Sequence, residues 1–111
     1  MTIQEQYENL EKTVRGYNPA ADFQHIRAAF EFAAEAHKDQ KRKSGEPYII
    51  HPLAVAQIVA EELRLDSESI EAALLHDVIE DTAATHEQVS KLFSPTIADL
   101  VEGVSKLTRI Q

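Results

Sequence analysis

The sequence contains no cysteine and no tryptophan, and only three of its 111 residues are glycine. Without cysteine the chain can form no disulfide, zinc–thiolate site or thiol nucleophile, which fits the reducing cytoplasm. It also lacks an apolar run long enough to span a bilayer, and its polar first residues lack the apolar stretch of a signal peptide. We therefore expect a cytoplasmic protein that does not bind a membrane.

Positive charge is scarce as well, because eleven basic residues stand against nineteen acidic ones and the formal net charge is −8. An acidic surface argues against direct nucleic-acid binding, which needs a basic footprint. However, Lys38, Lys41, Arg42 and Lys43 lie within six positions of one another. Positive charge gathered in this way can hold an anionic ligand. Otherwise the composition, 43% hydrophobic and 27% charged, is that of one globular domain with one core.

Helical periodicity extends along most of the chain, and no stretch alternates convincingly with the period of a strand. Gly45 and Pro47 break the pattern, which predicts a loop over residues 38–48. Residues 53–60 are apolar almost all round, so we expect the helix that opens at His51 to be central and buried. We predict an all-α fold with helices at 2–15, 21–37, from 51 onward, 67–81, 85–93 (where THEQ has capping-box spacing) and from 94 onward.

The stretch LLHDVIEDT, residues 74–82, places four ionisable side chains in an otherwise apolar run. On a continuous helix the four fall on one arc about 140° wide. Burying carboxylates side by side costs several kcal/mol each unless a cation compensates. His76 and Asp77 can then supply a nitrogen and an oxygen ligand, while Glu80 and Asp81 are placed for acid–base work. The alternative is a solvated acidic face with a surface histidine, and this helix alone does not decide between the two.

A second polar cluster is the segment RKSGEPYIIHP, residues 42–52, where donor-rich side chains precede a glycine turn. Arginine can grip a phosphate or stack on a base, and lysine supplies a point charge. His51 lies at the start of one apolar helix and His76 near the end of another, so antiparallel packing would bring the two together. The alternative is a solvated loop followed by a histidine without a ligand role.

Taken together, the strings RKSGEPYIIHP, ALLHDVIEDT and LVEGVSKLTRI closely resemble the N-terminal hydrolase domain of the RelA/SpoT family of (p)ppGpp synthetase/hydrolases. That domain belongs to the HD-domain phosphohydrolase superfamily. The resemblance covers residues 20–111 and implies an all-helical HD-domain bundle there, with residues 1–19 as an N-terminal extension or helix. It also implies removal of the 3′-diphosphate from guanosine 3′,5′-bis(diphosphate), giving GDP or GTP and pyrophosphate, with Mn²⁺ as cofactor.

The resemblance assigns roles to individual positions of this sequence. The positions that match the family's Mn²⁺ ligands are His51, His76 and Asp77. The positions that match the acidic pair that activates or orients the attacking water are Glu80 and Asp81. Arg42 matches the residue that packs on the guanine base, and the other nucleotide-pocket positions are Lys43, Ser44 and Tyr48.

One family ligand has no counterpart, because the last aspartate of the HD signature is missing. Asp99 is the only aspartate after Asp81, and its surroundings, TIADLVEG, differ from those of the family ligand. We therefore expect a fourth ligand beyond residue 111 and interpret the chain as an N-terminal fragment. By itself it should show weak or no hydrolysis, and the exposed apolar faces of 53–60 and 70–79 favour self-association. His25, His37 and His86 are interpreted as non-ligands, with His37 packed in the core and His86 exposed.

Two other functions stay open beside the hydrolase. One is a catalytically inactive HD domain kept as a regulatory module of a (p)ppGpp synthetase, although relatives of that kind have lost the His-Asp or Glu-Asp pair that is present here. The other is an HD phosphohydrolase of a different nucleotide. A parent protein with GTP pyrophosphokinase activity is compatible with the resemblance, but no residue of this chain points to synthesis.

Overall fold

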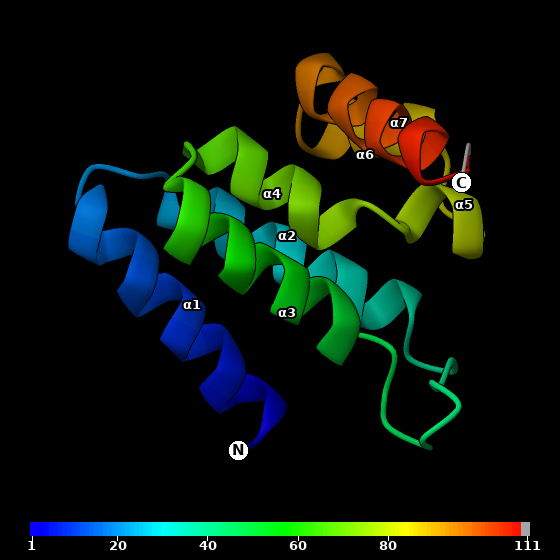
Figure 1. The fold of residues 1–111 in the computed structure, drawn as a ribbon. Coiled ribbons are helices and arrows are strands. Elements are labelled where there is room, and N and C mark those ends of the chain that lie inside the picture. Colours follow the sequence, from blue (N-terminus) through cyan, green and yellow to red (C-terminus); the bar gives the residue numbers. More distant parts are fainter. Residues whose placement is uncertain (110–111) are drawn as a thin grey trace.

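A computed structural model describes residues 1–109, and the side chains of residues 1–103. Within that range the chain is helical, with no strand and one isolated bridge between Lys41 and Pro47 (Figure 1). No helix of the described residues is long and apolar enough to cross a membrane. The elements are α1 (Ile3–Tyr17), α2 (Phe23–Ala36), α3 (Ile50–Ile58), the π-helical turn η1 (Val59–Leu63), α4 (Ser67–Leu75), α5 (Val78–Asp81), α6 (His86–Leu92) and α7 (Pro95–Arg109).

The helices begin where side chains satisfy their first backbone N–H groups. The side chain of Asp66 accepts from Ser69 N at the start of α4, and Asp22 does the same for α2. Thr85 and Gln88 form a reciprocal capping box at α6, which confirms the start that the THEQ spacing predicts. Short polar signals in the sequence therefore determine where these helices begin.

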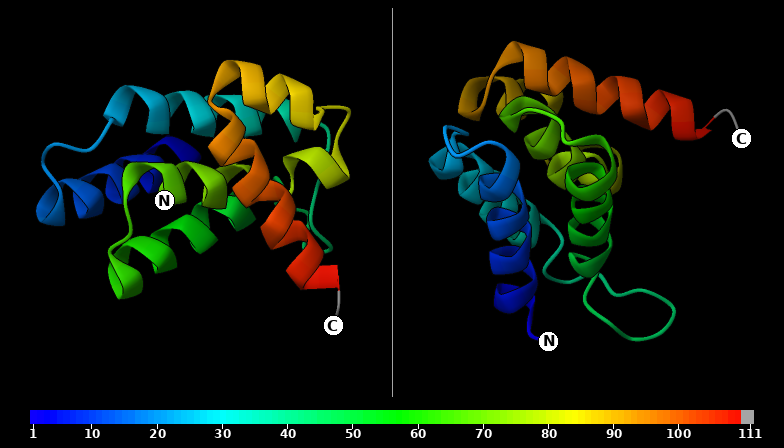
Figure 2. Two further views of the ribbon diagram at one scale, coloured as in Figure 1. Left: turned by 90° about the horizontal axis from the view of Figure 1, so that it is seen from above. Right: turned by 60° about the vertical axis from the view of Figure 1, so that its left-hand side comes forward.

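Helices α1 to α4 lie side by side around one apolar core (Figures 1 and 2). Helix α1 belongs to this core, since Tyr7 is fully buried and its ring stacks on that of Phe30 in α2 at 4.5 Å. Helices α6 and α7 pack against each other, and α7 closes over α4. The largest fully buried apolar side chains are Tyr7, Leu10, Ile26, Ile70, Leu74, Leu75 and Ile97. The all-α prediction is confirmed for the described residues.

The predicted helix over residues 67–81 is wrong in one respect, because it is interrupted at His76–Asp77. In a continuous helix the Ala73 carbonyl would accept from the Asp77 amide. Instead it accepts from the Nδ1 of His76 at 2.7 Å and lies 3.5 Å from the His76 amide. The imidazole competes with the backbone for this carbonyl, so α4 ends at Leu75 and α5 starts after Asp77. The single arc predicted for the four charged residues therefore does not exist.

The prediction that the helix over residues 53–60 is central and buried holds for one of its faces only. Leu53, Ala56 and Ala60 face the core, but Ile58 is 59% exposed. Each of the three core residues lies three or four positions from the next, so this helix buries one stripe, as most surface helices do.

Candidate active site

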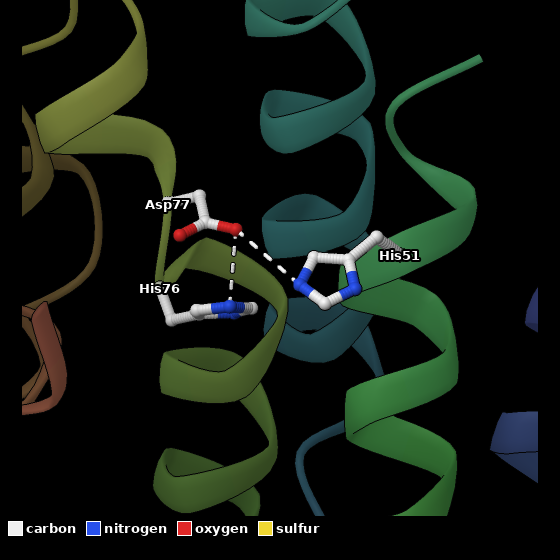
Figure 3. A group of neighbouring side chains, drawn as sticks. All are labelled: His51, His76 and Asp77. Carbon is white, nitrogen blue, oxygen red and sulfur yellow. Dashed lines mark ion pairs between the residues drawn. The ribbon is translucent and has the colours of Figure 1, made fainter. Parts of the chain in front are cut away.

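Three side chains from two places in the sequence converge at one end of the helical core (Figure 3). His51 is the second residue of α3, and His76 and Asp77 form the break between α4 and α5. The Oδ2 atom of Asp77 lies 3.1 Å from Nε2 of His76 and 3.7 Å from Nε2 of His51. Each residue offers one ligand atom, and these atoms lie within 4.8 Å of one another. The expected meeting of the α3 start and the α4 end is confirmed.

The hydrogen bond from Nδ1 of His76 to the Ala73 carbonyl turns the second ring nitrogen, Nε2, toward the other two residues. Because the Ala73 carbonyl can only accept, the Nδ1 of His76 carries the proton in that bond. Its Nε2 then faces Asp77 and His51. In metal-bound histidines, too, the nitrogen that does not bind the metal usually donates to a carbonyl or carboxylate and so fixes the orientation of the ring. Two imidazole nitrogens and one carboxylate oxygen are a donor set that suits a divalent first-row metal ion. The residues present therefore fit a metal centre.

The charge states of this group follow from burial and from its hydrogen bonds. Burial disfavours the ionised Asp77, but the hydrogen bonds from His76 and Tyr48 outweigh it and hold the pKa of Asp77 below its usual value. Burial lowers the pKa of His51, and the neighbouring His76 adds to this effect. Burial also opposes the charged form of His76, yet the bonds to Asp77 and Ala73 raise its pKa overall. Asp77 is thus an anion and His51 a neutral base near pH 7.

Tyr48 joins the metal-ligand group to the acidic pair. Its hydroxyl donates to Oδ2 of Asp77 at 2.8 Å and lies 3.3 Å from Oδ2 of Asp81. Burial and the adjacent carboxylates raise the pKa of Tyr48, so its hydroxyl stays protonated and acts as a donor. Asp81 and Glu80 are exposed at the end of α5. The sequence predicted Tyr48 only as a nucleotide-pocket residue, and its contact with Asp77, 29 positions away, was missed.

The basic loop forms a pocket of about 690 Å³ beside His51. Gly45 turns the loop with φ +91°, a conformation that favours glycine, and its N–H donates to the Arg42 carbonyl at 2.8 Å. The Arg42 N–H in turn donates to the Glu46 carbonyl at 2.9 Å. The residues that line the pocket are Lys41, Arg42, Lys43, Ser44, Tyr48 and His51. All four predicted substrate residues are among them, and Lys41 is the lining residue that the sequence prediction missed.

A second, apolar pocket of about 390 Å³ lies on the other side of His51 and His76. Leu100 of α7, which is 41% exposed, forms part of its wall. Its other apolar lining residues are Val55, Val59, Leu65, Ala72 and Ala73. The pocket is part of the exposed apolar surface that the sequence predicted for 53–60 and 70–79, and self-association through it stays a prediction.

Asp99 and the remaining histidines lie outside the ligand group. Asp99 Oδ1 lies 3.0 Å from Nε2 of His86, whose side chain is 38% exposed, so this pair is a surface contact between α6 and α7. His37 is 1% exposed, as predicted for a core histidine. His25 Nδ1 lies 3.6 Å from an oxygen of Asp22 in the first turn of α2.

Comparison with known proteins identifies the family. The sequence model of the HD domain matches residues 29–111. This chain belongs to the HD domain family. The resemblance to the RelA/SpoT hydrolase domain is also confirmed. The bifunctional (p)ppGpp synthase/hydrolase SpoT of Escherichia coli (strain K12) is 50% identical over 105 residues, covering 95% of this chain and 15% of that protein. The guanosine-3′,5′-bis(diphosphate) 3′-pyrophosphohydrolase of Aquifex aeolicus (strain VF5) is 52% identical over 104 residues, which cover 94% of this chain and 14% of that protein.

A solved structure agrees with the sequence relatives. The structure of a metazoan ortholog of SpoT, described as hydrolysing ppGpp, matches with a TM-score of 0.70 and 38% identity over 73% of this chain and 47% of that chain. The HD domain described here spans about 15% of the length of the curated relatives it matches. What those whole proteins do is therefore a basis for proposals about this chain.

Proposed function

We propose that this HD domain is a metal-dependent phosphohydrolase that removes the 3′-diphosphate of (p)ppGpp, giving GDP or GTP and pyrophosphate. One observation carries the proposal: the His51, His76 and Asp77 group opens directly onto the basic pocket, with His51 belonging to both. A phosphate bound among the basic residues would thus lie next to the metal centre. The names of the relatives, which include 3′-pyrophosphohydrolases, support the same substrate.

We propose Mn²⁺ as the ion and His51, His76 and Asp77 as three of its ligands, because mixed imidazole and carboxylate sets suit this metal. When bound, such an ion lowers the pKa of a coordinated water and offsets negative charge on the phosphate. Three protein ligands leave coordination positions for water, for phosphate oxygens and for a fourth protein ligand, which we expect outside the described residues. Tyr48 holds the Asp77 carboxylate in place through the 2.8 Å hydrogen bond.

The remaining proposed site residues contact either the guanine base, the phosphates or the attacking water. Arg42 stacks on the guanine base, and Lys43 and Ser44 contact phosphate oxygens. Lys41, which lines the same pocket, adds positive charge. Glu80 and Asp81 orient the attacking water and accept its proton. Hydrolysis adds water across the bond between the ribose 3′-oxygen and the diphosphate, so the hydroxyl joins phosphorus and a proton returns to the 3′-oxygen.

The test is a product analysis with ppGpp as substrate. We expect a longer protein that carries this domain together with the fourth ligand to release pyrophosphate and GDP in the presence of Mn²⁺ and to stop when the metal is chelated, whereas residues 1–111 alone should show weak or no hydrolysis. Arg42→Ala should weaken ppGpp binding, measured by calorimetry, and leave Mn²⁺ binding unchanged, since Arg42 is placed to hold the nucleotide.

Lys12→Ala is the matched control, because it removes one exposed positive charge from α1, away from the pocket. Equal ppGpp affinity in the Arg42 and Lys12 variants would show that the basic loop is merely solvated. Release of a different product, or turnover of another nucleotide in preference to ppGpp, would overturn the substrate assignment.

A further inference from the structure

Gln40, the residue just before the basic pocket, is hydrogen-bonded to three separate parts of the molecule. Its side-chain Nε2 donates to the main-chain carbonyl of Asp81, 41 positions away, at 2.5 Å. Its Oε1 lies 2.6 Å from Nδ1 of His37 at the end of α2. Its main-chain carbonyl accepts from the N–H of Tyr48 at 3.0 Å. We call Gln40, His37 and these three bonds the Gln40 clasp.

The directions of the bonds in the Gln40 clasp are determined by the groups themselves. The Asp81 carbonyl can only accept, so the NH₂ group of Gln40 faces it and Oε1 faces His37. The Nδ1 of His37 must therefore carry a proton. Its Nε2 is buried and has no hydrogen-bond partner among the described residues. A second proton there would be buried without an acceptor, which is unfavourable. The geometry thus places the proton of His37 on Nδ1 and not on Nε2.

The Gln40 clasp holds Tyr48, which bonds the proposed metal ligand Asp77, and also Asp81 of the acidic pair. The Tyr48 hydroxyl bonds Asp77 and lies close to the Asp81 carboxylate, while the Tyr48 amide and the Asp81 carbonyl are both held by Gln40. The ring of His37 also lies against that of Tyr48, with centroids 4.7 Å apart. Helix α5 has only four residues, so its position depends on such external bonds.

We propose that Gln40 and His37 are positioning residues, which set the distance between the acidic pair on α5 and the nucleotide loop. This role rests on the proposed hydrolase function. Neither residue lines the basic pocket or belongs to the ligand group, so neither is expected to touch substrate or metal. A small misplacement of reacting groups can lower a rate by about 10²-fold, so the effect of losing the Gln40 clasp should appear in kcat.

The first experiment is Gln40→Met, which keeps the side-chain length, adds no charge and removes both side-chain bonds. In the longer protein, with ppGpp and Mn²⁺, we expect kcat to fall about 10- to 100-fold while KM changes less than about threefold. Gln24→Met, at an exposed position of α2, is the matched control and should leave both constants unchanged. Wild-type kcat in Gln40→Met would overturn the proposal.

A second pair of variants tests the positioning role even if Gln40→Met does not fold. His37→Asn places an amide N–H near the former Nδ1, and His37→Gln places one near Nε2, while both lose the ring. The positioning role requires His37→Asn to retain several-fold more kcat than His37→Gln. Equal kcat values, or the opposite order, would overturn it.

Nuclear magnetic resonance of the wild-type protein separates this inference from the proposed function, because it needs no substrate. We expect the long-range ¹H–¹⁵N spectrum to show His37 as the Nδ1–H tautomer, and the Gln40 side-chain amide to exchange slowly. An Nε2–H tautomer overturns the Gln40 clasp whatever the protein hydrolyses. If the longer protein shows the expected tautomer but does not hydrolyse ppGpp, the proposed function is overturned, and with it the positioning role.

Discussion

Two buried polar side chains, one along helix α4 and one directly after its last residue, differ in how their polar atoms are satisfied. At its end, His76 is 7% exposed, and its ring nitrogens contact the Ala73 carbonyl and the Asp77 carboxylate. Along its length, Glu71 is 1% exposed, and its Oε1 has no hydrogen-bond partner among the described residues. Nδ1 of His25 lies 3.8 Å from this Oε1.

Burial has opposite outcomes for two carboxyl groups of this region. One is that of Glu71, and the other is that of Asp77, which follows His76 and whose side chain is 18% exposed. Burial raises the pKa of Glu71 to about 7, and the negative charges of Asp22, Glu68 and Asp66 add to the shift. Burial also acts on Asp77, but its hydrogen bonds hold the pKa below the usual value. Partners therefore decide whether a buried carboxyl is an anion ready for a cation or an acid that resists ionisation. The ionised Asp77 belongs to the candidate metal site, whereas the unpartnered Glu71 lowers the stability of the fold at a pH where it ionises.

The largest effect should come from removing the charge at the partnered position. Asp77→Asn keeps the side-chain shape and an oxygen that can accept from Tyr48, but it takes the anionic ligand from the proposed metal centre. We expect Mn²⁺ affinity, measured by calorimetry, to fall on the order of 10²-fold or more, and pyrophosphate release from ppGpp to disappear. The helical circular dichroism spectrum should be unchanged.

Asp99→Asn is the control for Asp77→Asn. It makes the same chemical change on a carboxylate that is 76% exposed and lies outside the ligand group. Both metal binding and turnover should survive in this variant. If Asp77→Asn binds Mn²⁺ as tightly as Asp99→Asn does, the metal-ligand assignment is wrong.

Local sequence signals predict some features of helix α4 and its neighbours and miss others. The caps at Asp66 and Thr85 are local, so the helix starts that they define were predicted correctly. The break after Leu75 was not, because competition for the Ala73 carbonyl depends on a side-chain rotamer and leaves the hydrophobic period unchanged. The proposed site residues were found from long strings shared with a known family.

Long-range polar contacts are what the sequence could not reveal. The bond from Gln40 to Asp81 and the burial of Glu71 both depend on how α2, α4 and the loop come together in space. Glutamine and glutamate are common on helix surfaces, so residue type alone predicts that both are solvated. Lys41 was recognised as part of a basic cluster, but its place in the pocket wall depends on the turn at Gly45.

The unpartnered position should produce the next largest effect, on stability. Because the pKa of folded Glu71 is raised from 4.5 to about 7, its contribution is fully present below about pH 4.5 and is lost as the pH rises through about 7. Glu71→Gln cannot ionise, so it should remove this part of the pH dependence. Above pH 8 the variant should be more stable than wild type by on the order of 2–3 kcal/mol.

Urea unfolding at several pH values between 5 and 8.5 measures this difference. Glu62→Gln is the matched control, since Glu62 is exposed in η1 and is not among the charges that shift the pKa of Glu71, so its unfolding free energy should follow that of the wild type. His25 also faces Glu71, so both variants should be compared again with His25→Ala present. A wild-type stability that does not fall between pH 5 and 8 would show that Glu71 finds a partner in solution.

The smallest effect should come from Tyr48→Phe, which sharpens the comparison by removing one partner from Asp77 while leaving its charge. The variant loses the 2.8 Å hydrogen bond to Asp77 and the approach to Asp81, but it keeps the ring against His37. A hydrogen bond to a charged group contributes about 1.5–3 kcal/mol, and part of that is recovered here because Asp77 still contacts His76. We therefore expect kcat/KM for ppGpp to fall about tenfold, equivalent to about 1.4 kcal/mol. Tyr17→Phe, which removes a hydroxyl bonded to the Leu65 carbonyl and to no member of the ligand group, should leave kcat/KM unchanged. A loss in Tyr48→Phe as complete as that in Asp77→Asn would mean that the hydroxyl takes part in the chemistry and does not only hold the carboxylate in place.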